Sequence, residues 1–235
     1  MIKIEPQFIR VGKELIGKAA VIAGDTERVR YLSRFLSKPK LVSKSRFLVY
    51  TGYYKGKKLS IASHGIGMPS ASLAIEELHA LGAQTIIRLG TAGGISKELA
   101  YRDVVIPTSA GYTPGGTIAE YFGSISKKFA PNGKIVQKLG KRLEAEGITP
   151  YYGSVFSSSA FYSEGHIGKG YIAVEMECAA LFALGKLRKF RAGAVLVISD
   201  SISNKNMSRV LSSSEVNRRM GKVAKSVLDT ASEYA

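Results

Sequence analysis

The sequence predicts a single α/β domain, residues 1–235, with a mixed central β-sheet flanked by helices. Short apolar runs rich in β-branched residues recur along the chain, and segments of helical period separate several of them. This alternation favours parallel strands. Two neighbouring runs are instead joined through Lys55-Gly56-Lys57, which indicates an antiparallel hairpin, so we expect a mixed sheet. A length of 235 residues suits one large domain with a full core.

The elements are expected in the following order along the chain. Eight strands are predicted, over residues 19–23, 47–54, 58–63, 85–89, 103–107, 153–156, 171–174 and 193–199. Five helices are predicted, over residues 26–36, 70–81, 133–146, 175–187 and 212–234. Thr26 suits the N-cap of the first helix. Residues 112–123 contain Pro114, Gly115 and Gly116 and are predicted to form a loop.

Composition narrows the class of protein. Hydrophobic residues make up 45% of the chain and charged residues 22%, which is ordinary for a globular protein. Cys178 is the only cysteine, so an intrachain disulfide is excluded, and we interpret it as a small buried apolar residue. The sequence has no signal-peptide pattern and no apolar run long enough to span a bilayer, which favours a cytoplasmic location.

The net charge of +16 suggests anionic partners. Lys and Arg are scattered along the whole chain, and the nearest approach to a cluster is residues 186–191. No motif combines basic and aromatic residues in the way that nucleic-acid stacking surfaces do. We therefore expect the charge to favour solubility and anionic small molecules rather than nucleic acid as the main partner.

Acidic residues mark the first candidate site. Glu175 and Glu177 lie where an apolar strand turns into a helix, and Asp200 ends the next apolar run. The chain holds only 18 acidic residues against 34 basic ones, so carboxylates at strand ends need a reason other than solubility. Strand ends in α/β proteins are where ligands bind.

A second set of candidate site residues is built around arginines. Gly24 follows the first strand and Arg28 lies in the first turn of the next helix, an arrangement suited to an anion. Arg88 stands in an otherwise apolar strand, where it needs an acid or an anion as partner. Thr91 lies in the expected turn just beyond it. Such donors suit inorganic phosphate. Arg46, before the hairpin, is a third and less distinctive arginine.

Two further features leave alternatives open. His64 stands in the glycine-rich turn His64-Gly-Ile-Gly67, where a histidine is either catalytic or, more often, structural. Phe161 and Tyr162 follow another strand, and they either pack in the core or offer a ring on which a planar heterocycle stacks.

Five motifs in order resemble the nucleoside phosphorylase superfamily, which includes purine nucleoside, uridine and methylthioadenosine phosphorylases. The resemblance extends from Ala20 to the last helix. The motifs are Gly24-Asp-x-x-Arg28; Tyr50-Thr-Gly-x-Tyr-x-Gly56 with His64-Gly-x-Gly-x-Pro-Ser70; Arg88-x-Gly-Thr-x-Gly93; Val155-Phe-Ser157 with Phe161-Tyr162; and Val174-Glu-Met-Glu177 with Val197-x-Ser-Asp200.

The resemblance implies a role for each matching residue. The residues that would hold phosphate are Gly24, Arg28, Arg88 and Thr91, with Arg46 reaching into the neighbouring subunit's site. Glu177 and Met176 would hold the ribose, and the base would contact Phe161, Val174 and Glu175. Sites at a dimer contact imply a homo-oligomer, with a hexamer as a trimer of dimers. No metal and no cofactor are implied, and inorganic phosphate is the co-substrate.

The implied activity is that of a purine nucleoside phosphorylase, in nucleoside catabolism and purine salvage. Asp200 would protonate N7 of the leaving purine, for which its pKa must be raised. Uridine phosphorylases lack this acid and carry a Gln and an Arg after the stacking phenylalanine, and residues 163–170 contain neither. The alternatives, in order, are methylthioadenosine phosphorylase and uridine phosphorylase.

The chain departs from the family pattern near its N-terminus, and two functions other than phosphorolysis are alternatives. The family has a histidine near the N-terminus that contacts the 5′ position of a neighbouring site, whereas this chain has Gln7 and Phe8 there. A related nucleosidase would use water and would lack the three arginines. A non-enzymatic nucleoside- or nucleic-acid-binding protein would explain the net charge without cleavage.

Overall fold

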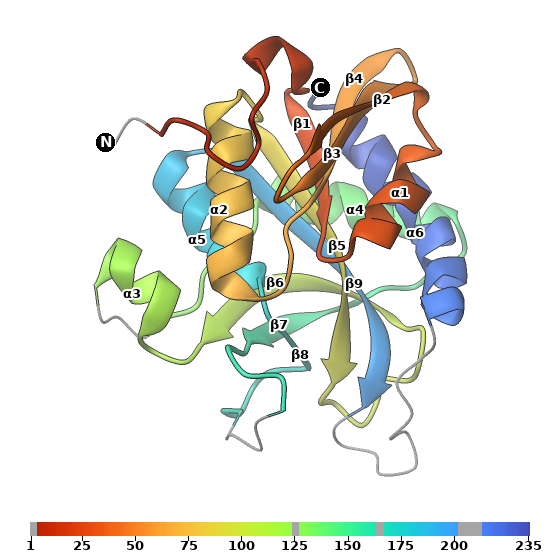
Figure 1. Cartoon of the computed structure of the whole chain (residues 1–235). Helices are drawn as coiled ribbons and strands as arrows, with labels where there is room; N and C mark the ends of the chain where they lie inside the picture. Colours follow the sequence, from red (N-terminus) through yellow and green to blue (C-terminus); the bar gives the residue numbers. More distant parts are fainter. Residues whose placement is uncertain (1–3, 124–126, 163–166, 202–212) are drawn as a thin grey trace.

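One sheet of nine strands organises the part of the protein that the structure describes. The computed structural model describes residues 4–123, 127–162, 167–201 and 213–235. The strand order is β2-β3-β4-β1-β5-β8-β7-β6-β9, and β9 also pairs with β5. The last five strands of that order, from β5 to β9, therefore form a closed ring. The other four, β2, β3, β4 and β1, extend the sheet from β5 and end at the open edge β2 (Figure 1).

The sheet contains both parallel and antiparallel pairs, so the predicted mixed sheet is confirmed. The strands are β1 (Ala19–Ala23), β2 (Ser37–Lys44), β3 (Leu48–Tyr54), β4 (Lys57–Ser63), β5 (Thr85–Gly94), β6 (Val104–Tyr112), β7 (Tyr151–Ser157), β8 (Ala173–Glu175) and β9 (Arg191–Ser201). The predicted hairpin is also confirmed: β3 and β4 are antiparallel and meet at Lys55 and Gly56, both with positive φ.

Helices cover both faces of the sheet. They are α1 (Thr26–Ser33), α2 (Gly67–Ala80), α3 (Gly116–Phe122), α4 (Gly133–Ala145), α5 (Cys178–Arg188) and α6 (Ser213–Ser232). The buried residues of α2 and α5 belong to one apolar cluster, and those of α1, α4 and α6 belong to a second. Two apolar layers thus hold the sheet between them, and the strand ends are left to carry polar groups.

Two elements differ from the prediction in kind. β2 was not predicted because its sequence, SKPKLVSK, lacks alternation and carries a proline and three lysines. It is a mostly exposed edge strand and, among the described strands, pairs with β3 alone. The predicted loop over 112–123 is wrong in part, because Gly115 and Gly116, both with positive φ, lead into the short helix α3.

Other differences concern where elements begin and end. The turn expected at Thr91–Gly94 is wrong: β9 runs beside β5 from Thr85 to Gly94 and supplies hydrogen-bond partners along its whole length. α1 ends at Ser33, earlier than predicted. α2 begins at Gly67, three residues before the predicted start, and α5 begins at Cys178, three residues after it.

Candidate functional site

Glu175, at the end of β8, is buried and surrounded by the protein's own donors. Its carboxylate accepts hydrogen bonds from the backbone N–H groups of Glu177 (2.8 Å) and Cys178 (2.9 Å) and from the hydroxyl of Ser157. Ser157 in turn accepts the N–H of Ala179 at 2.9 Å. Glu175 therefore fixes the first turn of α5 and the position of the residues that precede it.

Glu177 and Arg88 form an ion pair inside the protein, although 89 positions separate them in the sequence. Nη2 of Arg88 contacts Oε2 of Glu177 and lies 3.6 Å from Oε2 of Glu175. The other oxygen of Glu177, Oε1, accepts the backbone N–H of Gly67 at 2.7 Å. Both charged residues are at least 95% buried, with exposed fractions of 4% for Glu177 and 5% for Arg88.

Each charge of this pair stabilises the charged form of its partner. Burial alone would lower the pKa of Arg88, but the carboxylates of Glu177 and Glu175 raise it above its ordinary value. Burial alone would raise the pKa of Glu177, but Arg88 holds it below its ordinary value. Both groups are consequently charged at neutral pH.

Several buried nitrogens close to this pair have no hydrogen-bond partner among the described residues. Within the described ranges, Arg88 uses only Nη2, and its Nε and Nη1 atoms are unpaired. Nε of Arg28 and both ring nitrogens of His64 are unpaired as well. Unpaired buried donors are costly, so their concentration at one place indicates a site for an anion that brings acceptor oxygens.

Electrostatics support the same conclusion. Burial lowers the pKa of Arg28, and the neighbouring Arg88 lowers it further. Two guanidinium groups that repel each other in a buried place are stabilised by an anion between them. The structure thus brings Arg28 of α1, Arg88 of β5 and Glu177 together.

Two glycines make room for this cluster. A Cβ built on Gly24 would lie 3.0 Å from the carbonyl oxygen of Gly65 and 3.5 Å from Cε1 of His64, so the turns after β1 and β4 touch here. A Cβ built on Gly90 would overlap Nη1 of Arg88. Thr91 lies on β5, partly exposed, and not in a turn.

Asp200 and Val174 stand on either side of Gly93. β9 pairs with β5 so that Asp200 is opposite Gly93, and β8 pairs with β5 so that Val174 is opposite the same residue. A Cβ built on Gly93 would lie 3.0 Å from Oδ2 of Asp200 and 3.3 Å from Cγ1 of Val174. The hydroxyl of Ser199 donates to Oδ1 of Asp200 at 2.8 Å. Asp200 is partly exposed and therefore accessible to a ligand.

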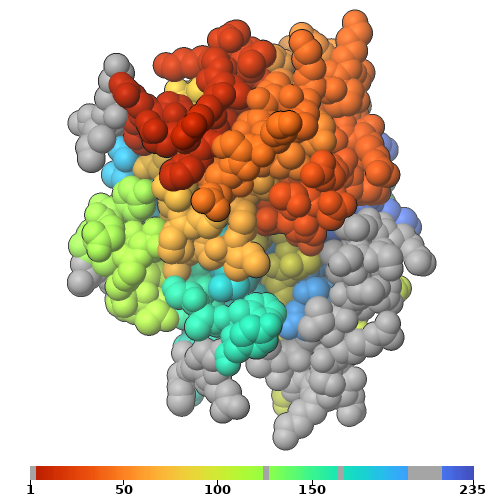
Figure 2. All heavy atoms as spheres, viewed as in Figure 1, coloured from red at the N-terminus to blue at the C-terminus, as the bar shows by residue number. Residues whose placement is uncertain are grey.

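Phe161 and Tyr162 do not pack in the core, so that interpretation is wrong. Their exposed fractions are 68% and 95%, and the two rings contact each other edge to face with centroids 5.1 Å apart. The turquoise segment that contains them lies on the face shown in Figure 2, just below the golden segment of α2. Exposed aromatic rings of this kind are available to stack on a ligand or to meet another subunit.

Arg46 is exposed in the turn between β2 and β3. The adjoining Ser45 donates its hydroxyl to the carbonyl of Phe8 at 2.7 Å. The turn that carries Arg46 and the N-terminal segment therefore lie side by side.

The N-terminal segment is attached to α2 by one carboxylate. Glu77 accepts the backbone N–H groups of Gln7 (2.6 Å), Phe8 (3.0 Å) and Ile9 (2.6 Å). The Phe8 ring packs edge to face on Phe47, with centroids 6.3 Å apart. The backbone around Gln7 is thus held in a fixed conformation.

Two residues of this site were missed or undervalued by sequence reasoning. Gly67, whose N–H holds Glu177, was noted as part of a glycine-rich turn but was given no role in the site. His64 was considered more often structural, yet it contributes two of the unpaired nitrogens.

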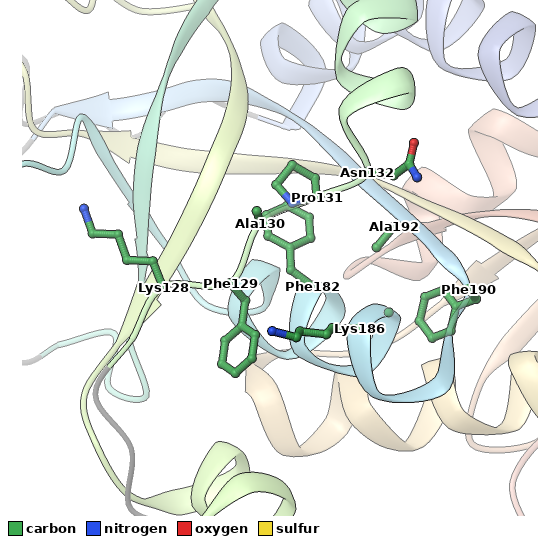
Figure 3. A pocket seen from close by; sticks show the side chains of 10 residues that line it. Lys128, Phe129, Ala130, Pro131, Asn132, Phe182, Lys186, Phe190 and Ala192 are labelled. Carbon is green, nitrogen blue, oxygen red and sulfur yellow. The ribbon is translucent and has the colours of Figure 1, made fainter.

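A separate cavity of about 340 Å³ lies elsewhere, between residues 128–132 and the second half of α5 (Figure 3). None of the candidate residues lines it. Across the described ranges, no cluster of His, Cys, Asp and Glu has the make-up of a metal site. Within those same ranges, no helix has the length and apolar character needed to span a membrane.

Comparisons with known proteins agree with this geometry. The family model described as the phosphorylase superfamily matches residues 18–233. A purine nucleoside phosphorylase of DeoD type from Exiguobacterium sp. is 34% identical over 198 residues, covering 80% of this chain and 82% of the relative. A guanosine phosphorylase from Halorubrum lacusprofundi is 29% identical, covering 80% of each chain.

A solved structure shows the same fold. Purine nucleoside phosphorylase from Toxoplasma gondii, in complex with immucillin-H, superposes with a TM-score of 0.88 and covers 99% of this chain and 97% of its own. Its sequence is 22% identical to this one, so the likeness concerns the fold.

Proposed function

Because the chain belongs to the phosphorylase superfamily, we propose that it is a purine nucleoside phosphorylase, which cleaves the N-glycosidic bond with phosphate to give free base and ribose 1-phosphate. The observation that supports this most strongly is the group of unpaired buried nitrogens on Arg28, Arg88 and His64 beside the Glu177 carboxylate. An anion site next to a carboxylate is what phosphorolysis of a sugar requires. A nucleosidase that uses water needs no such arginines.

Phosphate binds at the turn after β1. Its oxygens accept hydrogen bonds from Arg28 and from the Nε and Nη1 atoms of Arg88, with the Gly24 backbone and the Thr91 hydroxyl as further donors. Binding reduces the repulsion between the two guanidinium groups, because the negative charge of the phosphate offsets their positive charges.

The ribose lies against Glu177 and Met176. The Gly67 N–H and Arg88 hold the Glu177 carboxylate in one orientation, in which it accepts hydrogen bonds from the 2′- and 3′-hydroxyls. As the glycosidic bond breaks, positive charge develops on the sugar. The phosphate dianion and the Glu177 carboxylate stabilise that charge, and a phosphate oxygen attacks C1′.

The purine lies between Phe161 and the wall formed by Val174. Asp200, beside Val174 across Gly93, donates a proton to N7 of the departing base. Glu175 supports this wall indirectly: its carboxylate is occupied by backbone donors, so it positions Val174 and Glu177 and does not itself bind the base. No metal or organic cofactor is needed for this chemistry.

The working unit is a homo-oligomer, a hexamer built as a trimer of dimers. The exposed position of Arg46, in the turn between β2 and β3, is what a residue that serves a neighbour's phosphate would show. Gln7, held next to the same turn, takes the position where the family has a histidine. Because this change affects contacts to the 5′ position, methylthioadenosine is a second candidate substrate.

Base release tests the proposal. The full-length protein is incubated with inosine, guanosine, adenosine, methylthioadenosine or uridine, each with and without phosphate. We expect release of purines only when phosphate is present, and the rank order identifies the substrate. Cleavage without phosphate would indicate a nucleosidase, and cleavage of uridine alone would contradict the role of Asp200. Inactivity across the panel would favour a binding protein.

A further inference from the structure

His64 is buried without a partner for either ring nitrogen. It follows β4, its exposed fraction is 0%, and Nδ1 and Nε2 make no hydrogen bond to any described residue. Its backbone is firmly held: its N–H donates to Ala23 at 3.0 Å, and its carbonyl accepts the Ser70 hydroxyl at 2.7 Å. A buried donor that makes no hydrogen bond destabilises the fold, so a role in binding explains the His64 ring better than packing does.

Charged groups from three elements face this ring. They are Arg88 on β5, Arg28 on α1 and Glu177 between β8 and α5. Burial lowers the pKa of Arg28 and the charge of Asp25 opposes this in part, while electrostatic interactions with Glu175 and Cys178 raise the pKa of Arg88. Burial first, and then Arg88, lower the pKa of His64 to about 4, with Arg28 contributing less; Glu177 and the Gly65 backbone oppose this in part. At neutral pH the ring is uncharged, with one N–H donor and one lone pair.

The position of the ring points to the same anion as the arginines. Cε1 of His64 lies 3.5 Å from the place that a Cβ on Gly24 would occupy, so the ring adjoins the turn from which α1 and Arg28 begin. An uncharged donor has an advantage here. It adds a hydrogen bond to the anion without placing a third positive charge beside Arg28 and Arg88.

We propose that His64 is a phosphate-binding residue, which donates a ring N–H to an oxygen of the phosphate held by Arg28 and Arg88. This inference rests on the proposed function only for the identity of the anion. The phosphate dianion brings negative charge close to the ring, and it therefore raises the affinity of His64 for a second proton.

The first test is a titration of the wild-type protein by NMR, with ¹⁵N-labelled histidine and no nucleoside. The chain has three histidines, so the ring signals are few. We expect inorganic phosphate to shift the ¹⁵N signals of His64 and to raise its pKa by about 1 or more. His79 is the internal control, because its Nδ1 lies 2.9 Å from the Ala83 carbonyl and its ring packs against Phe190. His64 signals that do not respond to saturating phosphate would overturn the proposal.

The second test uses His64→Leu, which has no donor, and His64→Gln, which keeps one. A lost hydrogen bond to a charged group corresponds to roughly a tenfold to hundredfold loss of affinity. We expect that loss in phosphate binding by calorimetry for His64→Leu, with partial recovery in His64→Gln and nucleoside binding within about twofold of wild type. Equal phosphate affinity in all three proteins would contradict the proposal, and His79→Gln serves as the matched variant.

The two tests separate this inference from the proposed function. Phosphate-dependent base release together with an unresponsive His64 would leave the function standing and reject the inference. Phosphate that shifts His64 in a protein with no activity on any nucleoside would support the inference and reject the function.

Discussion

Arg88 and Glu177 contact each other through Nη2 and Oε2, and this one contact joins the proposed phosphate site to the proposed ribose site. The remaining nitrogens of Arg88 are free for an anion, and the second oxygen of Glu177 is held by Gly67. Each residue therefore has a structural partner and a ligand-binding group. Substitutions at these positions affect stability and activity together, and experiments must separate the two effects.

Replacing Arg88 alone is expected to destabilise the fold. Arg88→Met leaves the Glu177 carboxylate buried without its cation, a change that costs about 3–5 kcal/mol. The double variant Arg88→Met with Glu177→Gln removes both charges and should recover most of that loss while remaining inactive. Urea denaturation of the two variants and the wild type measures the difference. A double variant no more stable than Arg88→Met would show that packing, not charge, is responsible.

Gly90→Ala tests whether the space beside the Arg88 guanidinium is needed. The new Cβ would overlap Nη1 of Arg88, so the guanidinium must move away from the anion site. We expect phosphate affinity to fall at least tenfold, with a smaller effect on nucleoside binding. Gly133→Ala is the control, because no atom lies within 4 Å of a Cβ built there. Unchanged phosphate affinity in Gly90→Ala would place the anion elsewhere.

The sequence predicts the sheet and its hairpin because those elements have strong local signals. Apolar runs identify β1, β4 and β9, and Gly56 identifies the turn between β3 and β4. β2 escapes because an exposed edge strand needs no apolar alternation. Its place in the sheet comes from pairing with β3, and the residues of β2 do not predict that pairing.

The contacts that join the candidate site residues could not be predicted from the sequence. Arg88 and Glu177 were each recognised as charges in apolar surroundings, whereas their ion pair depends on a chain path of 89 residues. Glu175 resembles a ligand-binding carboxylate in sequence, and only the structure shows its backbone partners. His64 has no local signal that separates a structural ring from an unpartnered one.

Asp200→Asn tests the proton donor. The amide cannot protonate N7, so we expect turnover of inosine or adenosine to fall about 10²- to 10⁴-fold while nucleoside binding persists. A nucleoside whose base already carries a positive charge, such as 7-methylguanosine, needs no proton and should lose much less. Asp103→Asn is the matched control, since Asp103 accepts the Ala100 N–H in a turn outside the site. Equal losses on both substrates would contradict the role of Asp200.

His64 makes stability depend on pH in a defined direction. In the unfolded chain the His64 ring becomes protonated below about pH 6.5. In the folded protein the pKa of the ring is about 4, so it stays neutral until the pH falls that far. The unfolded state therefore binds more protons in this window, and stability falls as pH drops from 6.5 to 4. The loss attributable to His64 is about 3 kcal/mol. Denaturation at pH 7 and pH 4, without phosphate, should show that His64→Leu loses less stability than wild type by this amount. Equal losses would mean that His64 is protonated in the folded protein.

Glu77→Gln tests the attachment of the N-terminal segment to α2. Three backbone N–H groups, those of Gln7, Phe8 and Ile9, donate to this carboxylate, and a neutral amide accepts them more weakly. We expect faster hydrogen exchange at these amides and a several-fold higher KM for the nucleoside, because Gln7 is proposed to serve a neighbouring site. Glu76→Gln is the matched control, because this adjacent carboxylate pairs instead with Arg188, at 2.8 Å. A raised exchange rate with an unchanged KM would separate the segment from substrate binding and limit Glu77 to a structural role.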